Sequence, residues 1–220
     1  MNEVSVKEQN EKGKIDFHPI WIYVVSQMVL PTCIMYIITL VTSMTQEESA
    51  YLAIIISMFA LAITFFIMYF KKIKTDIKRL TKKQIIFTVI AAIVGLALNF
   101  GVSMLFSKLN VKMENQDLLS NMFGNYKIPL IILATIPMPF AEEIVFRYSF
   151  GSLIRKKTVF VIVSSLLFAI GHGIGIATTL YFLLGVVYCI TYLKTDRNVV
   201  ASSIAHAFNN IVGVIFMLIG

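Results

Sequence analysis

Residues 158–193 carry no formally charged side chain over 36 consecutive positions. A single helix of this length would measure about 54 Å at ~1.5 Å per residue, whereas the hydrocarbon core of a bilayer is ~30 Å thick. The segment is therefore expected to fold back on itself, and Gly171, Gly173 and Gly175 mark the predicted turn. Because backbone polar groups in lipid must be satisfied within the chain, we expect two short membrane helices here.

Other apolar runs extend this pattern along the chain. Residues 51–70 are uncharged and have the length that a bilayer core requires. With 58% hydrophobic and 14% charged residues, the composition differs from that of a soluble globular domain. The sequence predicts an all-α polytopic membrane protein with about seven transmembrane helices. Their expected positions are residues 19–43, 51–70, 84–107, 128–153, two spans within 158–193, and 199–220.

The distribution of basic residues predicts the orientation in the membrane. The net charge is +7, and Lys and Arg gather in short loops between apolar runs, most densely in residues 71–83. This follows the positive-inside rule with a cytoplasmic N-terminus, so no nucleic-acid partner is needed to explain the charge. Anionic-lipid binding is a second interpretation of the 71–83 cluster, which topology explains more simply.

Three charged residues interrupt the apolar segment 128–153: Glu142, Glu143 and Arg147. One ionised side chain at a helix centre opposes insertion by about 2.5 to 3.5 kcal/mol, so three would oppose it by about 8 kcal/mol. Glu143 and Arg147 are four residues apart and share a helix face, whereas Glu142 points about 100° away. We therefore interpret Glu143 as a structural acid and Glu142 as the working acid. Pro137 and Pro139 should break or restart the helix just before them.

Further polar residues are expected at the depth of Glu142. Counting from the basic ends of their spans at ~1.5 Å per residue puts His172, His206 and Glu142 roughly 21, 14 and 16 Å above the inner face. Asn210 is four residues after His206 and shares its face, and Asn209 lies beside it. A single buried His or Asn often only bridges helices. Their combination at one level favours a functional site.

The segments Glu142–Arg147, Phe168–His172 and His206–Asn210 resemble the three ordered motifs of the CPBP intramembrane proteases, Glu-Glu-x-x-x-Arg, Phe-x-x-x-His and His-x-x-x-Asn. That family includes type II CAAX prenyl endopeptidases, Abi proteins and bacteriocin self-immunity proteins. The resemblance covers residues 128–220 and implies that this part is the catalytic helical core. It leaves a cytoplasmic tail at residues 1–17, and three membrane helices with an outer loop at 18–127.

The resemblance also implies roles for the motif residues. Glu142 and His172 would hold and activate a water molecule, while His206 and Asn210 would donate hydrogen bonds to the oxyanion. Glu143 and Arg147 would fix the helix and tune Glu142.

A metal-dependent alternative stays open, because Glu142, His172 and His206 are possible ligands of Zn²⁺. The chain lacks His-Glu-x-x-His, and we favour the version without a metal cofactor. Cys33 and Cys189 lie in separate apolar runs, so no disulfide or thiolate metal site is expected.

Other protease chemistries lack their residues. An aspartyl dyad is not expected, because every Asp is predicted in a tail or loop, at Asp16, Asp76, Asp117 and Asp196. Ser149 and Ser152 have no Gly-x-Ser-x-Gly setting.

The expected function is that of an intramembrane endopeptidase acting on a membrane-associated peptide or protein. The bias toward Ile, Lys and Asn is typical of bacteria, which favours the plasma membrane as location and leader, signalling or bacteriocin-type peptides as substrates. The expected partners are membrane lipid and this substrate. A non-catalytic immunity or scaffold protein is the alternative, and an ion transporter that uses the buried Glu and His residues is a third.

Overall fold

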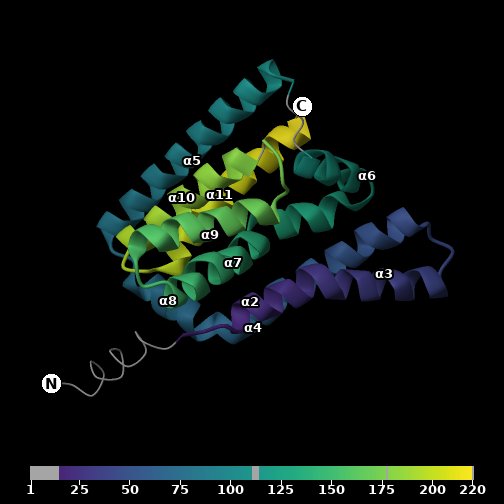
Figure 1. Ribbon diagram of the computed structural model, residues 1–220, viewed down its shortest axis with the longest axis horizontal. Helices are drawn as coiled ribbons and strands as arrows, with labels where there is room; N and C mark the ends of the chain where they lie inside the picture. The colour runs from purple at the N-terminus through teal and green to yellow at the C-terminus, as the bar shows by residue number, and fades with distance from the viewer. Residues whose placement is uncertain (1–14, 111–113, 177, 220) are drawn as a thin grey trace.

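The computed structural model describes residues 15–110, 114–176 and 178–219, so most of the predicted cytoplasmic tail lies outside the described residues (Figure 1). The described residues form helices and no strand. In chain order the elements are α2 (His18–Val24), η1 (Val25–Val29), α3 (Leu30–Val41), α4 (Gln46–Arg79), α5 (Lys82–Lys108), α6 (Glu114–Thr135), α7 (Pro137–Glu143), η2 (Ile144–Ser149), α8 (Phe150–Leu153), α9 (Lys157–Gly171), α10 (Thr178–Lys194) and α11 (Val199–Ile219).

The prediction of an all-α membrane protein is confirmed. Among the described residues, four segments are long and apolar enough to cross a bilayer: α2 to α3, α4, α5 and α11. The last turns of α6 form a fifth with α7 to α8, bent by 40°. The shorter apolar helices α9 and α10 make up the expected number of about seven. The turn predicted around Gly173 separates them, and Gly173 has a φ of +121° that favours glycine.

The first span contains a single wide turn. Residues Val25–Val29 form the π-helix η1, which ends just before Leu30. Pro31 therefore lies in the first turn of α3, where its missing N–H leaves no hydrogen bond unmade. An extra residue in the preceding turn thus accommodates Pro31 within the span.

Helix α4 is longer than predicted. A capping box formed by Thr45 and Glu48 starts the helix before Tyr51, the predicted first residue. The helix then continues to Arg79, through the basic cluster where the sequence predicts a loop. Lys and Arg are good helix formers, and charge alone does not end a helix that leaves the bilayer. A second capping box, between Thr81 and Gln84, starts α5 after a break of two residues.

The prediction that every Asp lies in a tail or loop is wrong for Asp117, which falls within α6, and for Asp76. Asp76 lies within α4 and is buried, where its carboxylate accepts a 2.9 Å hydrogen bond from the N–H of Val199. Asn198 donates to its carbonyl, and Lys72 pairs with its carboxylate at 3.0 Å. Asp76 thus accepts a hydrogen bond from an N–H group at the N-terminus of α11 that has no partner within the helix, which is a structural role.

The bundle places the motif helix at its centre. Helix α11 packs against α5, α6, α7 and α10, and α7 also packs against α4 (Figure 1). Helices α3 and α4 pair as a hairpin, and α9 pairs with α10. The end of the predicted tail is anchored at α8, where the N–H of Asp16 donates to Ser152 at 3.2 Å and Tyr69 donates to its carboxylate at 2.8 Å.

Candidate functional site

The site begins at the predicted break before Glu142. Ile136 has φ −130° and ψ −54°, outside the helical region, and α7 starts at Pro137. Two of the first three residues of α7 are prolines, which have no N–H group. This buried helix start therefore has few N–H groups that need a hydrogen-bond partner. The break matches the expectation that Pro137 and Pro139 restart the helix.

The two adjacent glutamates have different surroundings. Glu143 is fully buried, and its Oε2 lies 3.2 Å from Nε of Arg147, which is also fully buried. The side chain of Glu142 keeps 12% of its surface exposed. The ion pair expected from the spacing of Glu143 and Arg147 is therefore present, and only Glu142 has a surface that water can reach.

Arg147 is enclosed by neighbouring helices. Its Nη2 donates to the carbonyl of Gly185 at 3.1 Å. Its guanidinium also lies 4.7 Å from the ring centre of Phe168 and 5.4 Å from that of Tyr188, within the range of cation–π interactions. Gly185 allows this close packing, because a Cβ there would lie 3.0 Å from the backbone of Ser165.

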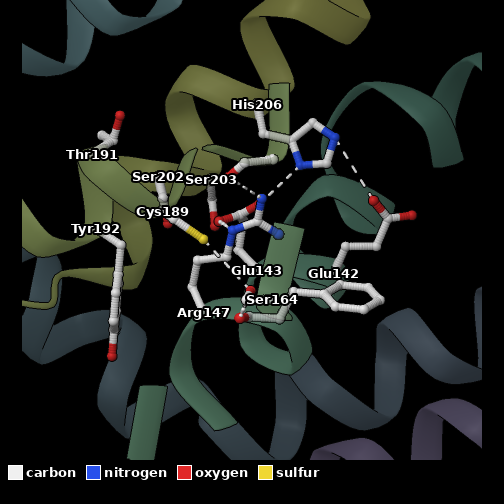
Figure 2. Close-up of polar contacts among 12 residues, drawn as sticks. Glu142, Glu143, Arg147, Ser164, Cys189, Thr191, Tyr192, Ser202, Ser203 and His206 are labelled. Carbon is white, nitrogen blue, oxygen red and sulfur yellow. Dashed lines mark hydrogen bonds and ion pairs between the residues drawn. The ribbon is translucent and has the colours of Figure 1, made fainter. Parts of the chain in front are cut away.

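His206 connects both glutamates from the facing helix α11 (Figure 2). Its Nδ1 lies 3.1 Å from Oε1 of Glu143, and its Nε2 lies 3.7 Å from Oε2 of Glu142. Since an ionised carboxylate only accepts hydrogen bonds, Nδ1 carries a proton and donates to Glu143. The imidazole stacks on Tyr188, with ring centres 4.5 Å apart. This contact and the bond to Glu143 turn Nε2 toward Glu142.

His172 lies at the end of α9, on the other side of Phe168. Its Nδ1 bonds to the carbonyl of Phe168 at 2.8 Å, so this nitrogen carries a proton and Nε2 is free to accept. The ring stacks on Tyr181 at 4.4 Å, and Phe168 lies 4.5 Å from His172 and 5.5 Å from His206. His172 is close enough to Glu142 and His206 to interact electrostatically with both.

The amide of Asn210 lies at the bend of the motif segment. Its Nδ2 donates to the carbonyl of Ala134 at 3.0 Å, just before the break at Ile136. Asn209 faces α5, and its Nδ2 donates to the carbonyl of Ala205 at 3.0 Å. Asn210 therefore satisfies backbone near the break. An amide NH₂ group carries a second donor.

The zinc alternative does not fit the arrangement seen here. Across the described ranges, no group of three or more His, Cys, Asp and Glu side chains is placed to hold a metal ion.

Ser149 and Ser152 do not form an activated serine site, because both are bonded to the backbone of Asp16.

The sequence interpretation missed the face of α10 that lines the site. Tyr181, Gly185 and Tyr188 are spaced by four and three residues and so share one face of the helix. This spacing is visible in the sequence and could have identified them. Ser164 was missed as well. Its hydroxyl donates to the carbonyl of Phe146 in the wide turn η2, and no sequence signal marks that partner.

Comparison with known proteins agrees with this geometry. The family described as type II CAAX prenyl endopeptidase Rce1-like matches residues 124–212, which contain all seven motif residues. The UPF0177 protein YxdF of Lactococcus lactis subsp. lactis (strain IL1403) is 30% identical over 148 residues, which cover 64% of this chain and 81% of that protein. The chain belongs to the CPBP family. No solved structure matches it. The segment matched by the Rce1-like family begins at residue 124 and leaves out α2 to α5.

Proposed function

We propose that this CPBP-family protein is an intramembrane endopeptidase that hydrolyses a peptide bond with water activated by Glu142. The observation that carries the proposal is the contrast between two adjacent carboxylates. Glu143 is sealed against Arg147 and His206, whereas Glu142 is partly exposed and lies 3.7 Å from Nε2 of His206. A carboxylate that faces water beside an imidazole has the geometry of a general base next to a hydrogen-bond donor.

In the proposed reaction, Glu142 takes a proton from a water molecule that Nε2 of His172 also holds. The oxygen of this water attacks the carbonyl carbon of the substrate and forms a tetrahedral intermediate. Nε2–H of His206 and the second N–H of Asn210 donate to the developing oxyanion. When the C–N bond breaks, Glu142 returns the proton to the leaving amine, so its charge is restored.

This use of His206 requires a proton on both of its ring nitrogens. With both ring nitrogens protonated, His206 and Arg147 carry two positive charges that face the carboxylates of Glu142 and Glu143. Such a balanced set is needed where charges are buried, because an unpaired ion in a low-dielectric medium is very unfavourable.

The proposed substrates are membrane-associated peptides in a bacterial plasma membrane. The relative in Lactococcus lactis supports a bacterial setting, and the apolar helices support an integral membrane protein in contact with lipid. The site lies within the membrane helices, so the scissile bond must enter the bilayer or its interface. Leader, signalling or bacteriocin-type peptides have this property.

The test compares purified wild-type protein in lipid nanodiscs with Glu142→Gln and His172→Ala. Synthetic membrane peptides of varied sequence are incubated with each, and products are identified by mass spectrometry. We expect cleavage by the wild type and a loss of about 10² to 10⁴-fold in both variants, the range for removal of a general acid or base. Thermal unfolding should still be cooperative.

Matched controls are Glu47→Gln and His18→Ala, whose side chains are exposed and lie outside the site. Wild-type cleavage rates in Glu142→Gln would refute the mechanism. If the protein cleaves no peptide but its cellular function persists in both variants, the non-catalytic immunity or scaffold alternative replaces it. Ion flux in proteoliposomes that depends on Glu142 would favour transport.

A further inference from the structure

The first membrane helix reaches the site through Tyr23, although this helix lies outside the segment matched to the family. Helix α2 packs against η2, the wide turn that follows the two glutamates. The ring of Tyr23 meets that of Phe146 edge to face, with centroids 5.5 Å apart. Phe146 lies one turn after Glu142, so the tyrosine packs beside the part of the chain that positions the proposed base.

The phenol oxygen of Tyr23 points toward the end of α9. A Cβ atom built on Gly171 would lie 3.8 Å from this oxygen, and Gly171 directly precedes His172. The phenol group is also close enough to Glu142 for the two to interact electrostatically. The hydroxyl therefore lies near the end of α9 that carries His172 and within electrostatic reach of Glu142.

The hydroxyl has no other hydrogen bond in the part of the chain that the structure describes. Tyr23 is half-buried, and a phenol O–H that packs against buried side chains usually has a hydrogen-bond partner. A water molecule that also bonds to Glu142 would supply one, because a water can bridge two polar groups at nearly the strength of a direct bond.

The wide turn η1 explains how α2 can pack against the site while α3 packs against another helix. It begins at Val25, two residues after Tyr23, and adds one residue to the helix. One added residue rotates the rest of the helix by about 100°. Helix α2 can thus face η2, and α3 can pack along α4.

We propose that Tyr23 is a positioning residue of the site, whose phenol O–H donates through a water molecule to the carboxylate of Glu142. This inference rests on the proposed function, and it gives the N-terminal helices a part in the reaction beyond anchoring.

The test is Tyr23→Phe, which keeps the ring against Phe146 and removes only the hydroxyl. With a membrane peptide that the wild type cleaves, we expect kcat to fall about tenfold, the size of one lost hydrogen bond. KM should stay at the wild-type value, and the variant should still unfold cooperatively above the assay temperature. The matched control is Tyr36→Phe, on the exposed face of α3, which should change neither constant. An unchanged kcat in Tyr23→Phe, or a fall that a parallel loss of Tm accounts for, overturns the inference.

Two comparisons separate this inference from the proposed function. If Glu142→Gln loses cleavage while Tyr23→Phe cleaves like the wild type, only the role of Tyr23 fails. If Glu142→Gln cleaves normally, the proposed function fails. Thermal unfolding of Tyr23→Phe, Glu142→Gln and the double variant needs no substrate. Non-additive changes in Tm support the coupling of the two groups, and additive changes refute it.

Discussion

Glu142 and Glu143 are neighbours in sequence, but only Glu143 has the buried contacts that are typical of a structural acid. Its carboxylate has Arg147 on one oxygen and His206 on the other, and no part of its side chain is exposed. Replacing one member of a buried ion pair leaves the other charge without compensation, which typically destabilises a protein by about 3–5 kcal/mol. The two glutamates should therefore respond differently to the same substitution.

We predict that Glu143→Gln lowers the free energy of unfolding by about 3–5 kcal/mol, because it leaves Arg147 without its buried counter-charge. Thermal or denaturant unfolding in detergent micelles measures the change. Glu47→Gln at the exposed start of α4 is the control and should stay within about 0.5 kcal/mol of the wild type. Equal stabilities of Glu143→Gln and Glu47→Gln would contradict the structural role of Glu143.

Some side-chain contacts of the site could be predicted from the sequence, and others could not. The pair of Glu143 and Arg147 follows from helical spacing, and the approach of His206 follows from its depth in the membrane. The bond from Nδ1 of His206 to Glu143 was not predictable, because it depends on how α11 is rotated about its axis. The bond of Asn210 to Ala134 depends on the same rotation and on the bend at Ile136.

At the level of helices, α5 and α11 approach each other closely at one glycine. A Cβ atom on Gly95 would lie 2.6 Å from Nδ2 and 3.2 Å from Cγ of Asn209. Asn209 is buried and bonds to its own helix through the carbonyl of Ala205. It has little room to move, so the absence of a side chain at Gly95 determines how close the two helices lie.

Replacing this glycine should loosen the contact. Gly95→Ala is expected to lower the free energy of unfolding by about 1–3 kcal/mol through overpacking. Gly101→Ala, on the same helix with no atom within 4 Å of the added methyl, should be neutral or more stable by up to about 1 kcal/mol. Unfolding of both variants in nanodiscs gives the comparison.

The partner of Gly95 provides a further check. Combining Gly95→Ala with Asn209→Ala removes the clashing amide, so the double variant should regain part of the lost Tm. If Gly95→Ala and Gly101→Ala unfold at the same temperature, the close approach of α5 and α11 is not supported.

Helix boundaries show what local sequence can and cannot determine. The starts of α4 and α5 carry capping boxes at Thr45 and Thr81 that could have been identified from the sequence alone. The predicted end of α4 comes too early, because the basic residues after Phe70 are typical of a loop at the membrane surface. Asp76 could not have been assigned to the start of α11, because its partner Val199 is distant in sequence.

For the whole molecule, the positions of charges and helix ends define two faces. The end of α4 and the start of α5, the segment before α9 and the turn before α11 carry basic residues and lie at one end of the bundle (Figure 1). The turn between α3 and α4 lies at the opposite end, and no Lys or Arg lies between residues 42 and 50. Since cytoplasmic loops are enriched in Lys and Arg, the basic end should face the cytoplasm, with the N-terminus on the same side.

Cysteine labelling in intact bacterial cells tests this orientation. Ser43 lies in the turn between α3 and α4, Lys83 lies at the start of α5, and both are exposed. In a background with Cys33 and Cys189 replaced by Ala, a membrane-impermeant maleimide should label Ser43→Cys in intact cells. It should label Lys83→Cys only after the membrane is permeabilised, because a bilayer separates the two positions. The reverse pattern would invert the assignment, and labelling of both residues in intact cells would contradict a membrane-spanning α4.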